Sequence, residues 1–205
     1  EAQTETGKET ETKKQTEKET KKQMQGISFS HDGKTFQYYE NNPVLDIGST
    51  EFRDPTIFYY KPTKRWIMVV AKALEKKVKI YSSPDLKHWE WESDFGPYGD
   101  QEKSWECPDL FQLSVDGDWN DKKWVMVVSV NWAKEQYFIG DFDGKEFRLI
   151  DNHPQEPLYV DKGMDYYASR TFWDYDFTLT TTTTMGWVAT WDYAQLVPST
   201  YGKGF

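Results

Sequence analysis

A sequence repeat of 53 to 58 residues runs through the larger part of this chain. Residues 66–70 read Trp-Ile-Met-Val-Val and residues 124–128 read Trp-Val-Met-Val-Val, so they are near copies 58 positions apart. Residues 54–58 and 107–111 resemble each other at an offset of 53. An insertion of five residues within positions 114–123 reconciles the two offsets. Chance does not easily give such agreement, so the repeat predicts a fold built from similar consecutive units.

Each unit has the composition of short β-strands separated by tight turns. Turn residues precede an aromatic residue in three places: Asp32-Gly33 before Phe36, Asp85-Leu86 before Trp89, and Asp143-Gly144 before Phe147. A unit of about 50 residues that contains several strands is typical of one blade of a β-propeller. We therefore expect an all-β fold, a β-propeller of which this chain holds about three to four blades. An open propeller leaves strand edges unpaired, so we expect the chain to be a fragment.

Residues 1–25 differ from the rest because they are almost entirely Glu, Lys, Thr and Gln. Ala2 and Met24 are their only apolar residues, so the segment has no apolar face to bury. We predict a disordered, polar leader over 1–25 and a partial propeller domain over 26–205. The leader shows no apolar stretch of the kind that a signal peptide contains.

The formal net charge of -9 belongs to residues 26–205, because the leader contains six Glu and six Lys. An acidic body argues against nucleic-acid binding, and no apolar run approaches the roughly 20 residues that cross a bilayer. Such a surface suits a neutral ligand, such as a sugar, that carboxylates handle. The alternative interpretation is that the negative charge only keeps the protein soluble.

Cysteine and histidine give no sign of a metal site. The chain has one Cys, and its three His lie in separate predicted turns. Because a zinc site needs several such ligands at close spacing, we expect no metal and no cofactor.

Acidic residues recur at the start of the predicted inner strands. Asp54, Glu106 and Asp165 occupy equivalent or adjacent positions in three successive repeats. Inner strands of a propeller line one central channel, so these side chains are expected to converge on one pocket. Clustered carboxylates raise one another's pKa, and glycoside hydrolysis uses such a pair. The alternative is that Asp-Pro merely begins a turn.

Two of these positions stand in motifs that identify a family resemblance. Phe52-Arg53-Asp54-Pro55 and Trp105-Glu106-Cys107-Pro108-Asp109 resemble the RDP and EC motifs of glycoside hydrolase family 32, the β-fructosidases. Further matching stretches lie at 82–89, 95–98, 136–144, 165–168 and 186–193. The resemblance covers residues 27–205 in the order that the family has.

The resemblance implies a five-bladed β-propeller followed by a β-sandwich. It implies a retaining glycosidase (levanase, inulinase or invertase) that releases terminal fructose from fructans or sucrose without a cofactor. It also implies an extracellular or periplasmic location, because fructans are extracellular polymers. By its matching motifs, the resemblance implies that Glu106 is the general acid/base and that Asp54 stabilises the transition state. It implies that Cys107 tunes the acid/base. The residues that it implies for substrate binding are Arg53, Asp165 and Trp191.

One family motif is missing from this sequence. The nucleophile is an Asp in an N-terminal WMNDPNG-type motif, and residues 41–43 (Asn-Asn-Pro) do not supply it. We therefore expect this chain alone to be inactive, and the rest of the propeller and the β-sandwich to lie elsewhere. A non-catalytic sugar-binding propeller remains an alternative. A propeller glycosidase acting on arabinan or xylan is another, which the Glu-Cys-Pro-Asp-Leu-Phe run disfavours.

Overall fold

The computed structural model of this protein describes residues 21–131, 134–163, 166–171 and 184–188. Apart from one 3-10 turn, η1 (Ala73–Glu75), every regular element of these residues is a β-strand. The strands are β1 (Ser28–Phe29), β2 (Gln37–Tyr38), β3 (Phe52–Tyr60), β4 (Arg65–Lys72), β5 (Lys77–Ser83), β6 (Glu90–Phe95), β7 (Trp105–Val115), β8 (Asp118–Val130), β9 (Lys134–Phe142), β10 (Phe147–Leu149), β11 (Leu158–Tyr159), β12 (Tyr166–Thr171) and β13 (Thr184–Val188). Over the same residues, no helix is long and apolar enough to cross a bilayer.

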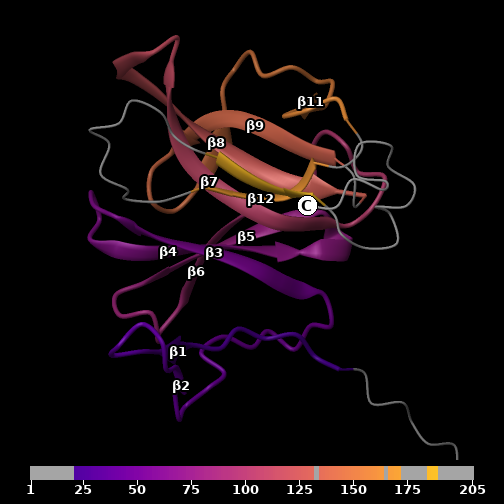
Figure 1. Cartoon of the computed structure of the whole chain (residues 1–205). Helices are drawn as coiled ribbons and strands as arrows, with labels where there is room; N and C mark the ends of the chain where they lie inside the picture. The colour runs from indigo at the N-terminus through magenta and orange to yellow at the C-terminus, as the bar shows by residue number, and fades with distance from the viewer. Residues whose placement is uncertain (1–20, 132–133, 164–165, 172–183, 189–205) are drawn as a thin grey trace, which may run out of the picture.

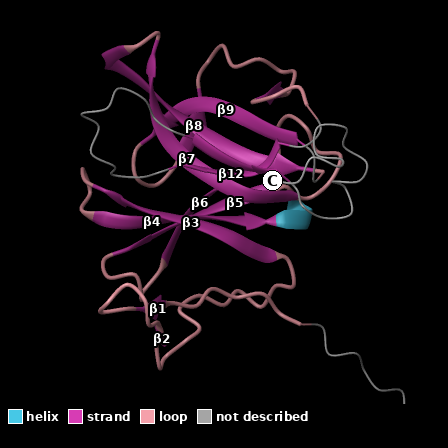
Figure 2. Ribbon diagram, viewed as in Figure 1, coloured by secondary structure: helices cyan, strands magenta, loops and turns pink. Residues whose placement is uncertain are grey.

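The strands form consecutive antiparallel sheets, which are blades of a β-propeller (Figure 1). The first full blade has the order β3-β4-β5-β6, and the second has β7-β8-β9-β10 with β11 paired to β9. The pair β1-β2 precedes these blades and the pair β12-β13 follows them. In Figure 2 the two full blades face each other, with β12 beside β7. The expected all-β, partial propeller is confirmed.

The main core lies between the two full blades. Alternate side chains of the first blade, among them Phe58, Ile67 and Val69, pack against Leu110 and Trp124 of the second. The rings of Phe58 and Trp124 are 5.8 Å apart. This pattern arises because successive side chains of a strand point to opposite faces, so one face of each blade meets its neighbour.

The outer hairpins repeat the same turn chemistry. In each turn the Oδ1 atom of an Asp accepts hydrogen bonds from the backbone N–H groups two and three residues later, at distances of 2.7–2.9 Å. The three residues are Asp32, Asp85 and Asp143. Local side-chain bonds of this kind fix a turn without distant contacts. The repeated hairpins are therefore confirmed, and β1-β2 is the outer hairpin of a preceding blade.

The five extra residues expected within 114–123 lengthen one hairpin. Strands β7 and β8 have 11 and 13 residues, against 9 and 8 for β3 and β4. The longer pair turns at Asp116 and Gly117, both of which have positive φ. The insertion thus extends the outer end of the hairpin and leaves the inner end unchanged.

The first strand of each successive sheet contains a β-bulge at the same point. The residues at these bulges have φ values of 61°, 49° and 56° at Asp54, Cys107 and Ala168. Ladder pairing skips from Arg53 to Thr56, from Glu106 to Asp109, and from Tyr167 to Arg170. A left-handed residue bends the strand and redirects its side chains. The three bulges therefore show which residues of β3, β7 and β12 are structurally equivalent.

This alignment corrects one expectation from the repeat. Tyr167, and not Asp165, is the counterpart of Glu106 in the third inner strand, because each directly precedes the left-handed residue. The link from Asp143 to Ala168 is three residues longer than the link from Asp85 to Cys107, and β11 lies within it. Asp165 itself lies outside the described residues.

The end of the predicted leader contacts the first blade. Gln25 is 7% exposed, forms a β-bridge with Leu45, and donates from Nε2 to the Phe52 carbonyl at 2.9 Å. The Oε1 atom of Gln23 accepts the backbone N–H of Phe52 at 2.8 Å. Ordered packing thus begins before the boundary at Gly26, and the division into leader and domain stays a prediction for residues 1–20.

Candidate active site

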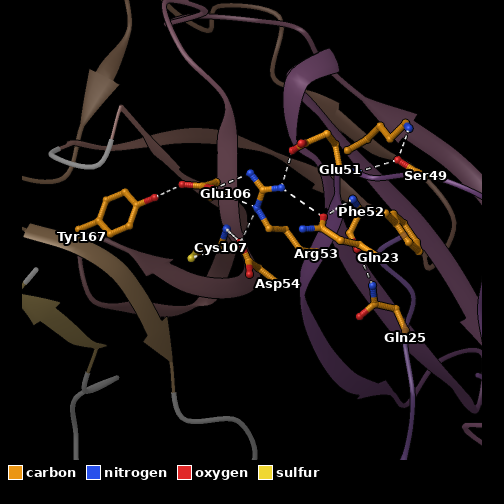
Figure 3. Close-up of polar contacts among 11 residues, drawn as sticks. Gln23, Gln25, Ser49, Glu51, Phe52, Arg53, Asp54, Glu106, Cys107 and Tyr167 are labelled. Atoms are coloured by element: carbon orange, nitrogen blue, oxygen red, sulfur yellow. Dashed lines mark hydrogen bonds and ion pairs between the residues drawn. The ribbon is translucent and has the colours of Figure 1, made fainter. Parts of the chain in front are cut away.

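The bulges of β3 and β7 place four of the sequence-predicted residues side by side. Arg53 and Asp54 come from β3, and Glu106 and Cys107 come from β7 (Figure 3). Because β3 and β7 are the first strands of neighbouring blades, residues 53 positions apart become direct neighbours. The site is formed between blades and not within one sheet.

Arg53 binds Glu106 through two nitrogen atoms. Its Nε and Nη2 donate to Oε1 of Glu106 at 3.0 and 2.8 Å. Its Nη1 donates to Glu51 Oε2 at 2.5 Å and to Gln23 Oε1 at 3.2 Å. Burial alone would lower the pKa of Arg53, but the hydrogen bonds to Glu51 and Glu106 outweigh it, so the pKa is raised. The guanidinium is a permanent charge whose orientation is fixed on three sides.

Tyr167 reaches Glu106 from the third inner strand. Its hydroxyl donates to Oε2 of Glu106, the oxygen that Arg53 leaves free (Figure 3). Burial, followed by the hydrogen bond to Glu106, raises the pKa of the phenol well above its usual range. Tyr167 therefore remains a protonated donor. With only 15% of its side chain exposed, Glu106 has both oxygens bound by donors from two other sheets.

Asp54 and Cys107 also contact each other across the two blades. The Oδ2 atom of Asp54 accepts the backbone N–H of Cys107 at 3.2 Å, and Sγ of Cys107 lies 3.7 Å from it. Burial, with the negative charge of Asp54 as second cause, raises the pKa of the Cys107 thiol to about 12. At neutral pH this thiol is protonated, so it is a weak hydrogen-bond donor and not a nucleophile.

Backbone contacts just behind the bulges hold the three inner strands together. Thr56 donates from Oγ1 to the Pro108 carbonyl at 2.7 Å. Arg170 donates from Nη1 to the Cys107 and Pro108 carbonyls at 2.7 and 3.2 Å. These bonds satisfy the carbonyls that the bulge removes from the sheet ladder. They also fix the spacing between the blades at the level of the site.

The arrangement supplies two carboxyl groups in different settings. Glu106 is oriented by donors on both oxygens, and Asp54 lies beside Arg53 with Nε and Oδ2 4.0 Å apart. Retaining cleavage of a glycosidic bond requires one positioned carboxyl that exchanges a proton and another carboxylate that acts as nucleophile; the contacts of Glu106 suit the first of these requirements. No group of three or more potential metal ligands occurs among the described residues.

Arg53, Asp54, Glu106 and Cys107 were predicted to share one site, and the structure brings these four residues together. Trp191, like Asp165, lies outside the described residues. Three residues that complete the contacts of Arg53 and Glu106 were not predicted from the sequence: Tyr167, Glu51 and Gln23. The contact of Glu51 with Arg53 could have been predicted, because oppositely charged residues two positions apart lie on the same face of a strand. The contact of Gln23 could not have been predicted, since no sequence feature distinguishes Gln23 from the other residues of the polar leader.

Comparison with known proteins identifies a family to which this chain is similar. Residues 6–204 match the model of the glycosyl hydrolases family 32 N-terminal domain. The chain is 42% identical over 182 residues to invertase 1 of Saccharomyces cerevisiae, a match that covers 85% of this chain and 34% of that protein. It is 44% identical over 186 residues to levanase of Bacillus subtilis, covering 86% of this chain and 27% of that protein. An extracellular exo-inulinase of Meyerozyma guilliermondii is 40% identical, with coverage of 86% and 35%.

Solved structures show the same relationship. The β-fructofuranosidase of Schwanniomyces occidentalis, complexed with fructosyl-erythritol, superposes with a TM-score of 0.76 at 38% identity, covering 84% of this chain and 34% of that one. The exo-inulinase of Aspergillus awamori gives a TM-score of 0.76 at 32% identity, covering 86% and 38%. The chain thus spans about a third of the length of these relatives.

Proposed function

The chain belongs to glycosyl hydrolase family 32, and from this we propose that it is part of the catalytic propeller of a β-fructosidase. The proposed reaction is the release of terminal fructose from levan, inulin or sucrose with retention of configuration. The relatives named invertase, levanase and exo-inulinase support this substrate class. The name of the exo-inulinase also supports an extracellular or periplasmic location.

One observation carries the proposal: donors from two other sheets hold both oxygens of Glu106. In the proposed mechanism Glu106 protonates the leaving oxygen and later takes a proton from the attacking water. Its two donors keep the carboxyl aimed at one point, so orientation is established before substrate binds. Arg53 and Tyr167 are the groups that provide this orientation.

Asp54 is proposed to bind fructose hydroxyls and to stabilise positive charge on the sugar ring in the transition state. Its Oδ2 already accepts the N–H of Cys107, so the carboxylate is held from the neighbouring blade. We place the nucleophile, the rest of the propeller and the β-sandwich in parts of the protein beyond this sequence. No nucleophile motif of the expected type occurs within it.

The test is hydrolysis of sucrose, inulin and levan by the full-length protein that contains this chain. Wild type should release fructose, and Glu106→Gln should lower kcat by about 100-fold or more, since it removes the proton that general acid catalysis requires. Glu40→Gln, on an exposed side chain, serves as the control and should retain activity. Binding of inulin by the wild type without any release of fructose would overturn the proposal in favour of a sugar-binding propeller.

A further inference from the structure

Glu135 is a buried carboxyl group to which the proposed mechanism assigns no role. It lies on β9 and is 2% exposed. It pairs across the ladder with Ser129 of β8, which in turn pairs with Glu106 of β7. Directly opposed residues share a face of the sheet, so Glu135, Ser129 and Glu106 form one row across the second blade.

Glu135 and Ser129 bind the backbone of the next inner strand. The Oε1 atom of Glu135 accepts the Ser129 hydroxyl at 2.7 Å and the Ser169 N–H at 2.9 Å. The Oγ atom of Ser129 accepts the Ala168 N–H at 3.2 Å. We call this set, Glu135 and Ser129 with the N–H groups of Ala168 and Ser169, the β12 anchor.

The β12 anchor fixes the bulge that orients Tyr167. Ala168 has a φ of 56°, a left-handed conformation that is unfavourable for a residue with a Cβ and persists only where surrounding contacts enforce it. Tyr167 immediately precedes Ala168 and donates to Glu106. The bonds to the Ala168 and Ser169 N–H groups hold the bulge itself, while Arg170 and Thr171 hold the strand that follows it.

A carboxyl group is a costly way to hold two strands together. Burial raises the pKa of Glu135 from 4.5 to about 7, against the opposing effect of its bonds to Ser169 and Ser129 and of the Arg170 charge. Its Oε2 atom has no hydrogen-bond partner among the described residues. The other titratable groups near it are Tyr166 on β12 and Cys107 on β7. Burying a polar atom without a partner costs stability, so a purely structural role is poorly served by this residue.

We propose that Glu135 is a positioning residue: through the β12 anchor it fixes the Ala168 bulge and thereby holds the Tyr167 hydroxyl on Glu106. This inference rests on the proposed function, since its consequence for catalysis requires Glu106 to be the acid/base. Glu135 acts through two intervening groups and does not itself contact the proposed substrate.

The experiment compares Glu135→Ala and Glu135→Gln in the full-length protein. The Gln side chain retains an oxygen that can accept both bonds, whereas Ala removes it. We expect Glu135→Ala to lower kcat by about 10- to 100-fold with KM nearly unchanged, because the acid/base is misplaced and not the substrate. Glu135→Gln should restore kcat to within about threefold of wild type, since the anchor is kept.

A second readout does not depend on activity. Hydrogen exchange of the peptide covering 166–171 should become faster in Glu135→Ala and stay at the wild-type rate in Glu135→Gln. Only the Ala variant frees the Ser169 amide and removes the acceptor that orients the Ser129 hydroxyl, which holds the Ala168 amide. Glu92→Ala is the matched control: Glu92 lies on β6 of the first blade, has 12% of its side chain exposed, and binds Ser82 of β5 and Lys145 of the β9-β10 turn. It should leave both readouts unchanged.

The possible results separate the two proposals. Wild type that releases no fructose would refute the proposed function, while exchange at 166–171 would still decide whether the anchor exists. The positioning role would be overturned if Glu135→Ala kept the wild-type kcat and the wild-type exchange rate. It would also be overturned if Glu135→Ala and Glu135→Gln lowered kcat equally. If Glu135→Ala fails to fold, Ser129→Ala replaces it: slower turnover with faster exchange supports the proposal, and wild-type values for both contradict it.

Discussion

Arg53 and Tyr167 bind different oxygens of Glu106, and neither could replace the other. A guanidinium is planar and presents several donors in a fixed geometry, which lets Arg53 bind Glu106, Glu51 and Gln23 at once. The Tyr167 phenol is a single donor held by its bulge. The orientation of Glu106 is thus determined by residue types that a conservative substitution does not reproduce.

Arg53→Lys tests this point. An ammonium group is one point charge, so it cannot keep the two bonds to Glu106 together with those to Glu51 and Gln23. If the proposed function holds, kcat/KM of the full-length protein for inulin or sucrose should fall by about 10- to 100-fold. Arg148→Lys is the control, because Arg148 pairs with Asp143 and Glu146 at an exposed hairpin. Equal activity of the two variants would show that the geometry of Arg53 is unimportant.

The thiol of Cys107 gives a second prediction at this scale. Because burial and the charge of Asp54 raise its pKa to about 12, very little thiolate exists at pH 8. Iodoacetamide should therefore alkylate Cys107 much more slowly in the native protein than in the protein unfolded by urea. Mass spectrometry of the peptide that contains Cys107, sampled over time, gives both rates. Alkylation at the unfolded rate would contradict the raised pKa.

At the scale of elements, the junction between β9 and β12 should respond to pH. Glu135 has a folded-state pKa of about 7 and an ordinary value of 4.5, so the folded state binds more protons than the unfolded state between these values. Stability must therefore fall as pH rises from 4.5 to 7 and change no further above 7 on account of this group. Glu135→Gln carries no such charge.

The measurement is the free energy of unfolding of wild type and Glu135→Gln in urea at several pH values. As pH rises through this range, the free energy of unfolding of Glu135→Gln should increase relative to that of wild type. The difference should reach roughly 3 kcal/mol at pH 8, which is the energy expected for a pKa shift of this size. Both proteins should have similar stability below pH 4.5. A difference that does not vary with pH would contradict the assignment of the raised pKa to Glu135.

The hairpins and strands could be predicted from the sequence because their causes are local. Asp85 and Asp143 fix their turns with bonds to residues two and three positions later. The four apolar residues that follow Trp66 and Trp124 are buried in both blades. The role of Tyr167 could not be predicted, because it depends on a bulge register that a longer link shifts away from the repeat. The repeat spacing measured between turns therefore does not predict the position of the third bulge.

At the scale of the molecule, stability depends on the core between the two full blades. Leu110 and Leu113 offer a matched pair on β7, since Leu110 is fully buried in that core and Leu113 is 37% exposed. Leu110→Ala should reduce the free energy of unfolding by about 2–5 kcal/mol through lost burial and the cavity left behind. Leu113→Ala should change it by less than about 0.5 kcal/mol.

Urea denaturation of the full-length protein, followed by tryptophan fluorescence, measures both values. The comparison isolates the interface between the blades, because the two substitutions remove the same atoms from the same strand. Similar losses for both variants would mean that the packing between the blades contributes little to stability.

The contacts of Glu106 have a consequence for biosynthesis. Each of three successive sheets supplies one part: Arg53, then Glu106, then Tyr167. Chains emerge from the ribosome with their N-terminal part first, and folding of each sheet can begin as it appears. The carboxyl group gains its last hydrogen-bond donor only when β12 has been translated and docked. A nascent or prematurely terminated polypeptide that lacks β12 would therefore hold the Glu106 carboxyl without one of its two donors, so this carboxyl is fully oriented only late in synthesis.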